Sequence, residues 1–447
     1  MIRRERTDAR QVAIRAVSLP FLLEGWVDAV PPLAVSSLCI DVRHLQRDCA
    51  FVARSATDAR RAQDCGARVV LHDECVQPVN ISIPTVIVPS LGKLLPKLAA
   101  RFHHHPADQM DLAAVAGGQG RTAAAWYIAQ SWQRSQGNAG LIGRLGQGVF
   151  SSLDAATRSF DAVSLQRCLA ECVAAGAETA ALEAGPGLLE RGCLDEVALK
   201  VAVYTGNAHS PQSDDTDRLQ PLFDRHAPRF AVINHDSAEG KRLASRAGTG
   251  IEVLTFGRNG ATELRGSILS QDSGGMSIRI ASPGGGGELR TALLGAHSLD
   301  GLLAAAGALV LMGMPWNRVM HQLEIMSPVP GRLACIAGEG NRPAAVIDHA
   351  STPQALEHAL LALRAHLHGR LYCILNTGGV RRRALAEVAS SLSDQVVSVT
   401  RSSRSMVLSR VLREARGHDI VLIAGGGRGE WSQRGEAEVR HLLEEAA

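Results

Sequence analysis

Lysine, aromatic residues and charge imbalance are all scarce in this chain of 447 residues. Aromatic side chains make up 4% of the residues, so a stacking platform for single-stranded nucleic acid is not expected. The net charge of +3 is too small for a dedicated basic face, and we predict no nucleic-acid partner. Only four of the 47 basic residues are lysine, namely Lys93, Lys97, Lys200 and Lys241. GC-rich codon usage explains such a ratio, but it also limits where the chain can supply an amine.

The sequence also lacks a segment that could cross or enter a membrane. Its longest apolar run, Leu302 to Met314, is shorter than the roughly 20 residues of a spanning helix, and it predicts a buried helix closed by Pro315. The charged N-terminus shows neither the apolar core nor the cleavage site of a signal peptide. The nine cysteines contain no CxxC pair and no zinc-type spacing. We therefore expect a cytoplasmic protein with reduced cysteines and no membrane insertion.

Short β-type runs alternate with helical patterns along nearly the whole chain. Strands are predicted at 67–71, 84–88, 112–116, 179–183, 200–204, 230–234, 344–348, 371–375 and 419–424. Helices are predicted at 122–132, 164–175, 302–312, 353–367 and 406–416. This alternation indicates an α/β protein with mostly parallel sheets covered by helices. Three domains are expected, at 1–106, 107–330 and 331–447, and the glycine-rich stretch Ser282–Glu288 is expected to be a flexible loop.

One glycine-rich turn has the pattern of a phosphate site. A predicted strand runs into Gly117, Gly118 and Gly120, and a helix starts at Arg121 and Thr122. Such a turn directs backbone N–H groups and a helix N-terminus at an anion. A complete P-loop has a lysine where this chain has Arg121, so a glycine-rich turn that holds no nucleotide is an equal alternative.

The order of short motifs resembles that of the Mur ligases, and among them the MurE-like UDP-N-acetylmuramoyl-tripeptide synthetases. The resemblance extends from about residue 36 to 434. It rests on these segments: Asp41–Arg43, Phe51–Ala53, Gly66–Ala67, Gly117–Thr122, Glu183 with Leu189, Asn234 with Asp236, Val329–Arg332, Asp348–Leu356, Gly378–Arg381 and Asp419–Gly427. Among them, Val329–Arg332 reads Val-Pro-Gly-Arg and matches its family motif in full.

This resemblance implies a three-domain fold: a UDP-substrate-binding α/β domain, a central P-loop-type ATPase domain and a C-terminal Rossmann-like domain. It also implies a reaction in which ATP phosphorylates a carboxylate and an amine then attacks the acyl phosphate, with magnesium as the metal. The nucleotide-binding positions it implies are Gly117, Gly118, Gly120, Arg121, Thr122, Asn234 and Arg332. Thr122 and Glu183 are the implied metal ligands, and Arg121, Arg332 and Asp348 are the residual catalytic candidates.

The same resemblance places other residues at many of the family's chemical positions. The phosphate-loop lysine falls on Arg121, and the carbamylated lysine falls on Leu219. Further replacements fall on Gly185–Gly187, Ser298, Gly301, Ser351, Val380, Arg382, Arg401–Arg404, Gly426 and Arg428. Losing a single preorganised electrostatic contact typically lowers an enzymatic rate by about 10²–10³. The sequence therefore favours loss of ligase turnover, with ATP and magnesium binding in doubt.

Three hypotheses follow from the sequence. The first is a ligase homologue without turnover that serves as a scaffold or regulatory partner, for example of an intact Mur ligase. The second is an active ATP-dependent ligase that joins an amino acid to a UDP-N-acetylmuramoyl-peptide or similar carboxylate, with an altered metal arrangement. The third is a sensor that binds a nucleotide or a UDP-sugar peptide.

Overall fold

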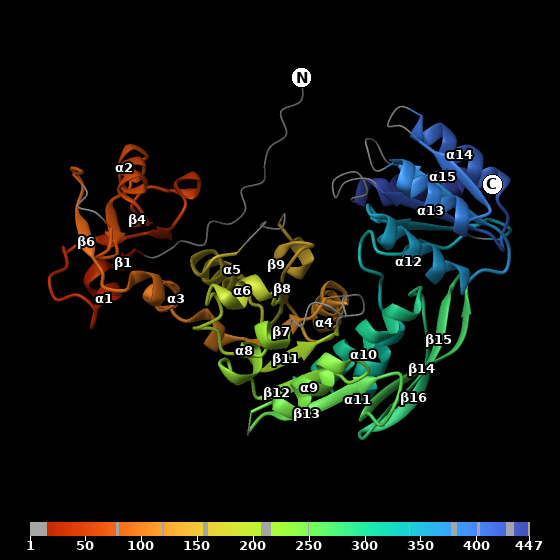
Figure 1. Ribbon diagram of the computed structural model, residues 1–447, viewed down its shortest axis with the longest axis horizontal. Helices are drawn as coiled ribbons and strands as arrows, with labels where there is room; N and C mark the ends of the chain where they lie inside the picture. Colours follow the sequence, from red (N-terminus) through yellow and green to blue (C-terminus); the bar gives the residue numbers. More distant parts are fainter. Residues whose placement is uncertain are drawn as a thin grey trace.

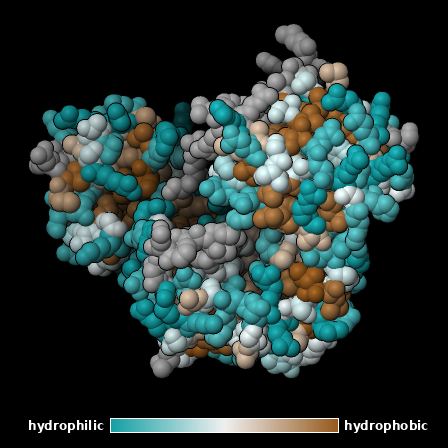
Figure 2. All heavy atoms as spheres, turned by 45° about the vertical axis from the view of Figure 1, so that its right-hand side comes forward, coloured by the Kyte–Doolittle hydropathy of each residue, from teal (hydrophilic) through white to brown (hydrophobic). Residues whose placement is uncertain are grey.

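The described residues form four β-sheets in the computed structural model, a two-stranded one of β1 and β2 and three larger ones that each form the centre of one lobe (Figure 1). The structure describes residues 16–76, 80–118, 120–154, 160–206, 216–248, 250–338, 340–376, 382–399, 403–425 and 433–445. The N-terminal lobe stands apart at one side of the molecule, and Figure 2 shows a recess between this lobe and the larger body.

The N-terminal lobe contains a parallel sheet of order β3-β4-β5-β6. In chain order its elements are β1 (Val17–Ser18), α1 (Leu19–Leu23), β2 (Ala34–Val35), β3 (Ser37–Cys39), η1 (Val42–His44), β4 (Cys49–Ala53), α2 (Ala56–Asp64), β5 (Val69–His72), β6 (Thr85–Ile87) and α3 (Leu91–Phe102). All residues of β4 and β5 are buried. A parallel strand that is covered on both faces has a continuous apolar sequence, which is why a strand was predicted at 67–71, where β5 lies, whereas β4 was not predicted.

The middle lobe is built on a ten-stranded sheet of order β16-β15-β14-β13-β12-β11-β7-β10-β8-β9. Its elements are η2 (Pro106–Gln109), β7 (Asp111–Ala116), α4 (Arg121–Ser135), β8 (Ala139–Ile142), β9 (Gln147–Val149), η3 (Phe150–Ser152), α5 (Ala162–Ala174), β10 (Thr179–Glu183), α6 (Pro186–Glu190), β11 (Val201–Tyr204), α7 (Thr216–Leu219), α8 (Pro221–Asp224), β12 (Phe230–Asn234), α9 (Ala238–Arg246), β13 (Glu252–Gly257), β14 (Leu264–Asp272), β15 (Gly275–Ser282), β16 (Gly285–Thr291), α10 (Ala296–Leu311) and α11 (Trp316–Glu324). Strand β7 lies between β10 and β11, so the carboxyl ends of these three parallel strands meet at one edge.

The expected loop at Ser282–Glu288 is wrong, because most of this stretch is β-structure. Strands β15 and β16 form an antiparallel hairpin in which Ser282 pairs with Gly285. The glycine stretch lies close to α11, since a Cβ on Gly287 would lie 2.9 Å from the Cε atom at the flexible end of Met320. Glycine composition alone indicates a loop, whereas in this sheet the missing side chains let a helix approach the strand closely.

The C-terminal lobe has a five-stranded sheet of order β17-β18-β21-β19-β20, in which only β17 is antiparallel to its neighbour. Its elements are β17 (Ala334–Ile336), β18 (Ala344–Asp348), α12 (Pro353–Arg364), β19 (Leu371–Asn376), α13 (Arg382–Leu392), β20 (Gln395–Ser398), α14 (Arg404–Glu414), β21 (Ile420–Gly425) and α15 (Gln433–Glu445). The helices cover both faces of this sheet (Figure 1), and two separate apolar clusters fill the space beneath them.

A buried histidine joins the C-terminal lobe to the long β14–β15 hairpin. His366 follows α12 and is fully buried. Its Nε2 atom accepts the backbone N–H of Gly295 at 2.8 Å, and its Nδ1 atom lies 2.8 Å from the carbonyl oxygen of Asp272. Because Nε2 accepts a hydrogen bond, the proton of the neutral ring belongs on Nδ1, which donates to Asp272. The contact ties the two lobes together at the base of α10.

Candidate phosphate-binding site

The predicted glycine-rich turn lies at the carboxyl edge of the middle sheet. Strand β7 ends at Ala116, Gly117 has φ 120°, and Gly120 caps α4 with φ 80° and without a side-chain cap. A Cβ on Gly117 would lie 2.5 Å from Thr205 Oγ1, so this position requires glycine both for its backbone conformation and for space. The first backbone N–H groups of α4 have no intrahelical partners and remain directed out of the helix end.

The neighbouring strand ends hold this turn in place. The N–H of Gly118 donates to the carbonyl oxygen of Gly206 at 3.0 Å, so this amide is already used within the protein. Asn234, at the end of β12, is buried and donates from Nδ2 to the carbonyl oxygen of Thr205 at 2.9 Å. Its Oδ1 accepts the N–H of Asp236 at 2.9 Å. Asn234 therefore supports the loop that carries Thr205 and Gly206, while Gln119 lies outside the described residues.

Arg121, Thr122 and Glu183 meet at the start of α4. The Thr122 hydroxyl donates to Glu183 Oε2 at 3.1 Å, and Arg121 Nε lies 3.3 Å from the same oxygen. Arg121 Nη1 also donates to the carbonyl oxygen of Gly117 at 3.1 Å. The Glu183 side chain is only 6% exposed and that of Arg121 is 19% exposed, so this ion pair is largely protected from water. The structure thus brings together three of the residues that the sequence singled out.

Arg144 is a site residue that the sequence did not indicate. It follows β8, and its backbone N–H donates to Glu183 Oε1 at 2.8 Å. The preceding Gly143 makes this approach feasible, because a Cβ there would lie 2.5 Å from Glu183 Oε1. Any residue type can donate a hydrogen bond from its backbone amide, so the identity of residue 144 does not indicate this contact. Only the neighbouring Gly143 could have indicated a close approach of the backbone.

Arg332 and Asp348 lie where the middle and C-terminal lobes join. Asp348 Oδ1 and Oδ2 accept the N–H groups of Ala350 and Leu333 at 2.8 and 2.9 Å. Burial raises the pKa of Asp348 to about 6, against the lowering by these two hydrogen bonds and by the nearby Arg332. The Arg332 side chain stays accessible to water, yet the surrounding protein desolvates the guanidinium enough to lower its pKa.

Electrostatic contacts connect Arg332 with the residues around Glu183. Asp348 and Glu183 raise the pKa of Arg332, while Arg144 lowers it. Within the described part of the chain, the Arg332 guanidinium forms no hydrogen bond or ion pair, which leaves its donors for a ligand. Glu183 is therefore contacted by the Arg121 guanidinium and the Arg144 backbone, while Arg332 interacts with Glu183 and Asp348 electrostatically at longer range.

Other positions implied by the resemblance have structural partners. Leu219 is 3% exposed and packs in the core beside Leu222 and Phe223. Ser298 donates to the carbonyl oxygen of Leu294 at 2.7 Å. A Cβ on Gly301 would lie 3.1 Å from the ring of Tyr127, so α4 and α10 pack closely at this point.

Of the further positions that the resemblance implies, some can be placed and others cannot. Gly185 lies beside Arg121, since a Cβ there would lie 3.4 Å from Arg121 Nη1, Gly187 lies in the first turn of α6, and Ser351 precedes the helix cap of α12. Val380, Arg401, Ser402, Gly426 and Arg428 lie outside the described residues, and so do Gly378, Gly379 and Arg381. In the N-terminal lobe, the Asp41 carboxylate accepts the N–H of Arg43 and pairs with its guanidinium, which lowers the pKa of Asp41 to about 2.

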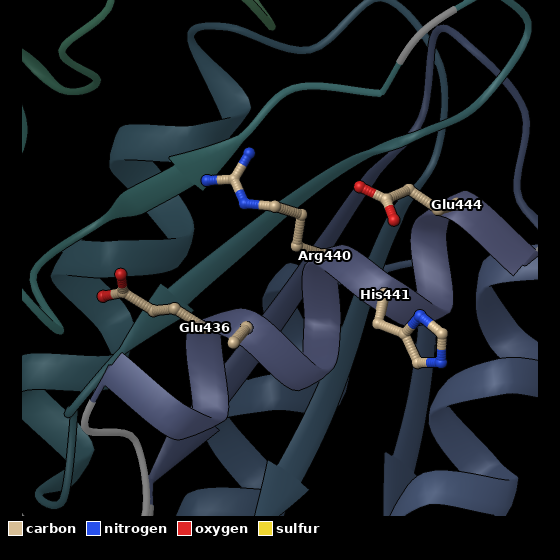
Figure 3. Close-up of a pocket in the computed structure, with 5 residues that line it drawn as sticks. Glu436, Arg440, His441 and Glu444 are labelled. Carbon is tan, nitrogen blue, oxygen red and sulfur yellow. The ribbon is translucent and has the colours of Figure 1, made fainter.

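No second site competes with this one in the described part of the chain. A shallow pocket on α15 is lined by side chains of that one helix, including Glu436, Arg440, His441 and Glu444 (Figure 3). Within the described ranges, no three His, Cys, Asp or Glu side chains are grouped to hold a metal ion. None of the described helices is both long and apolar enough to span a membrane.

Comparisons with known proteins give the family of this chain. The model of the Mur ligase middle domain matches residues 115–309, and that of the Mur ligase glutamate ligase domain matches residues 331–438. The chain is 30% identical over 429 residues to a UDP-N-acetylmuramoyl-L-alanyl-D-glutamate–2,6-diaminopimelate ligase of Alkalilimnicola ehrlichii, covering 88% of this chain and 85% of that protein.

Solved structures show the same fold. A UDP-N-acetylmuramoyl-L-alanyl-D-glutamate–2,6-diaminopimelate ligase matches with a TM-score of 0.76 at 21% identity, over 96% of this chain and 99% of that one. The MurF ligase of Thermotoga maritima in complex with ADP matches with a TM-score of 0.62 at 16% identity, over 92% and 98%. The predicted three-domain α/β architecture is confirmed, and this chain belongs to the Mur ligase family.

Proposed function

We propose that the protein is an ATP-dependent amide ligase that acts on a UDP-N-acetylmuramoyl-peptide or a similar carboxylate. The observation that carries this proposal is the glycine turn and helix start at Gly117–Thr122, which open beside Glu183 at the edge of a parallel sheet. Support also comes from the relative in Alkalilimnicola ehrlichii, which is named as a ligase of this type. The same relationship favours peptidoglycan synthesis as the process served.

The side chains of the site suit the handling of a polyphosphate. The N-terminus of α4 and the glycine turn would receive phosphate oxygens through backbone N–H groups. Arg121 and Arg332 would neutralise negative charge while a phosphoryl group moves from ATP to the substrate carboxylate. The attacking amine then displaces phosphate and forms the amide bond. The ADP complex of the Thermotoga maritima structure supports a nucleotide as the ligand of this fold.

The residues present do not fit a resident magnesium ion in this arrangement. Both oxygens of Glu183 accept hydrogen bonds from Arg121, Thr122 and Arg144. A divalent ion beside Glu183 would also meet the positive guanidinium of Arg121, and like charges at this distance repel strongly away from water. We therefore assign no step of the reaction to a bound metal.

A second candidate function is a ligase homologue that binds its ligands without turnover, as a scaffold, regulatory partner or sensor. The observation that favours it is that two positions implied to be chemical hold packing residues here. Leu219 is buried in the core, and Gly301 leaves space for the ring of Tyr127. Neither residue offers a group for phosphoryl transfer.

One assay separates the two candidates. The purified protein is incubated with ATP, UDP-N-acetylmuramoyl-L-alanyl-D-glutamate and either diaminopimelate or lysine, with phosphate release and amide mass followed together. Ligase function predicts phosphate release that requires both substrates and a product of the amide's mass. Binding of ATP without phosphate release would instead support the second candidate.

A matched pair of glycine variants controls this assay. Gly117→Ala introduces a Cβ that would lie 2.5 Å from Thr205 Oγ1, so it should remove activity by distorting the phosphate loop. Gly137→Ala is the control, because Gly137 also has a positive φ of 130° but has no atom within 4 Å of the added Cβ. Equal activity of the two variants would contradict the role of the loop.

A further inference from the structure

The Glu183 carboxylate has a complete set of partners from the protein itself. Oε2 accepts from the Thr122 hydroxyl at 3.1 Å and from Arg121 Nε at 3.3 Å, and Oε1 accepts from the Arg144 backbone at 2.8 Å. The carboxylate is 6% exposed, so its charge depends on these donors for compensation. A buried carboxylate that is paired and hydrogen-bonded in this way is stable without an added cation.

The local glycines make room for the guanidinium in this position. A Cβ on Gly185 would lie 3.4 Å from Arg121 Nη1, at the tight end of ordinary contact. Arg121 Nη1 also donates to the carbonyl oxygen of Gly117 at 3.1 Å, which orients the planar group between the turn and Glu183. The guanidinium is therefore held by two fixed acceptors.

The surrounding charges offer little attraction to a further cation. Arg121 pairs with Glu183, and Arg332 lies near enough to Glu183 and Asp348 for both acids to raise its pKa. Both oxygens of Asp348 already accept backbone N–H groups, from Leu333 at 2.9 Å and from Ala350 at 2.8 Å. No described group of three acidic, His or Cys side chains is present to bind a divalent ion.

We propose that the Arg121 guanidinium takes the place of a divalent cation at Glu183, so that the Gly117–Thr122 loop binds a nucleoside di- or triphosphate without metal. This inference rests on the proposed nucleotide binding and adds that the binding does not require a divalent metal ion. Arg121 supplies a fixed positive charge beside Glu183, and its fork can present N–H donors to a phosphate oxygen. A metal ion would have to displace this side chain before it could reach the carboxylate.

The first test is titration calorimetry of the full chain with ADP and ATP, in excess EDTA and in excess magnesium chloride. We expect dissociation constants that agree within about threefold between the two conditions, a difference of less than about 0.7 kcal/mol. Binding that is tighter by about tenfold or more with magnesium would overturn the proposal. Absence of binding in both conditions would overturn the proposed nucleotide binding itself, which distinguishes the two failures.

The second test changes Arg121 and measures the metal directly. Arg121→Ala should weaken ADP binding in EDTA by about tenfold or more and free Glu183 to bind Mn²⁺, measured by electron paramagnetic resonance without nucleotide. The wild-type chain should bind no Mn²⁺ at this site. Stoichiometric Mn²⁺ binding by the wild type, or unchanged ADP binding in EDTA by the variant, would contradict the role of Arg121.

Two further variants separate this role from a loss of folding. Arg279→Ala is the control, because Arg279 forms an exposed ion pair with Glu288 at 2.6 Å on the β15–β16 hairpin and should change neither measurement. Arg121→Lys keeps one positive charge but lacks the planar fork, and it should retain metal-independent binding more fully than Arg121→Ala. Thermal unfolding of each variant confirms that the compared proteins are folded.

Discussion

Replacing His366 by leucine should uncouple the C-terminal lobe from the β14–β15 hairpin and destabilise the protein. Leucine fills a similar volume but cannot accept the Gly295 N–H or donate to the carbonyl oxygen of Asp272. Each buried polar group left without a partner costs about 1–3 kcal/mol. Because the ring serves at least two such groups, we expect a loss of about 3 kcal/mol in the free energy of unfolding at pH 8.

The effect should depend on pH in a defined direction. Burial is the main cause that lowers the pKa of His366, against raising by its hydrogen bonds to Asp272 and Gly275. Its stabilising contribution is therefore present above the ordinary pKa of about 6.5 and is lost as the pH falls through the folded value. The difference between the wild type and His366→Leu should shrink as the solution is acidified.

Urea unfolding followed by tryptophan fluorescence measures this difference, since Trp126, Trp132 and Trp316 all lie in the middle lobe. His368→Leu is the matched control, because His368 lies two residues further along the same loop and is exposed. A loss of less than about 0.5 kcal/mol for His366→Leu, the range of ordinary surface substitutions, would refute the reasoning. So would an equal loss in the control variant.

Three other substitutions test separate features of the fold. Gly331→Ala should lower the free energy of unfolding, measured by thermal unfolding, by about 2 kcal/mol or more, because φ at this position is 67° and the added Cβ would lie 1.9 Å from the Nε2 atom of His349. Gly313→Ala is the control and should show only the smaller cost of its φ of 104°, because no atom lies within 4 Å of the added Cβ. Burial raises the pKa of Asp300 to about 6, so the folded protein holds this proton more tightly than the unfolded chain does. The free energy of unfolding should therefore fall as the pH rises from about 4 to 6, and Asp300→Asn should make it less dependent on pH in this range. Asp161→Ala removes the capping box of α5 and should lower the unfolding free energy by about 1 kcal/mol, measured in urea, with no change contradicting the cap.

Much of the fold was predictable because buried parallel strands have continuous apolar sequences. Strands β10 and β12 have the predicted bounds, and β7 begins one residue earlier than expected. Helix α10 starts at Ala296, six residues before the predicted start, because its first turns pack against α4 through small residues that carry no clear helical pattern. The predicted closing residue Pro315 instead caps α11, after α10 has ended at Leu311.

The site was predictable in its members but not in their contacts. The sequence pointed to Thr122 and Glu183 as metal ligands and to Arg121 as a phosphate ligand. In the structure Arg121 and Thr122 both bind Glu183, and this carboxylate has no oxygen free of protein donors. Residues 183 and 121 come together only because β10 and β7 are neighbours in the sheet, which residue types alone do not specify.

The sequence by itself determined the α/β class, the phosphate-type turn and the scarcity of lysine, because strand burial, glycine spacing and composition are local properties. The tertiary structure decided which charges meet. It placed an arginine against the single buried carboxylate of the turn, where a lysine would lack the planar fork. It also placed the glycine-rich stretch at 282–288 in a hairpin, because β16 pairs with β15 along its whole length. The first outcome depends on residues that are distant in the chain and adjacent in the fold.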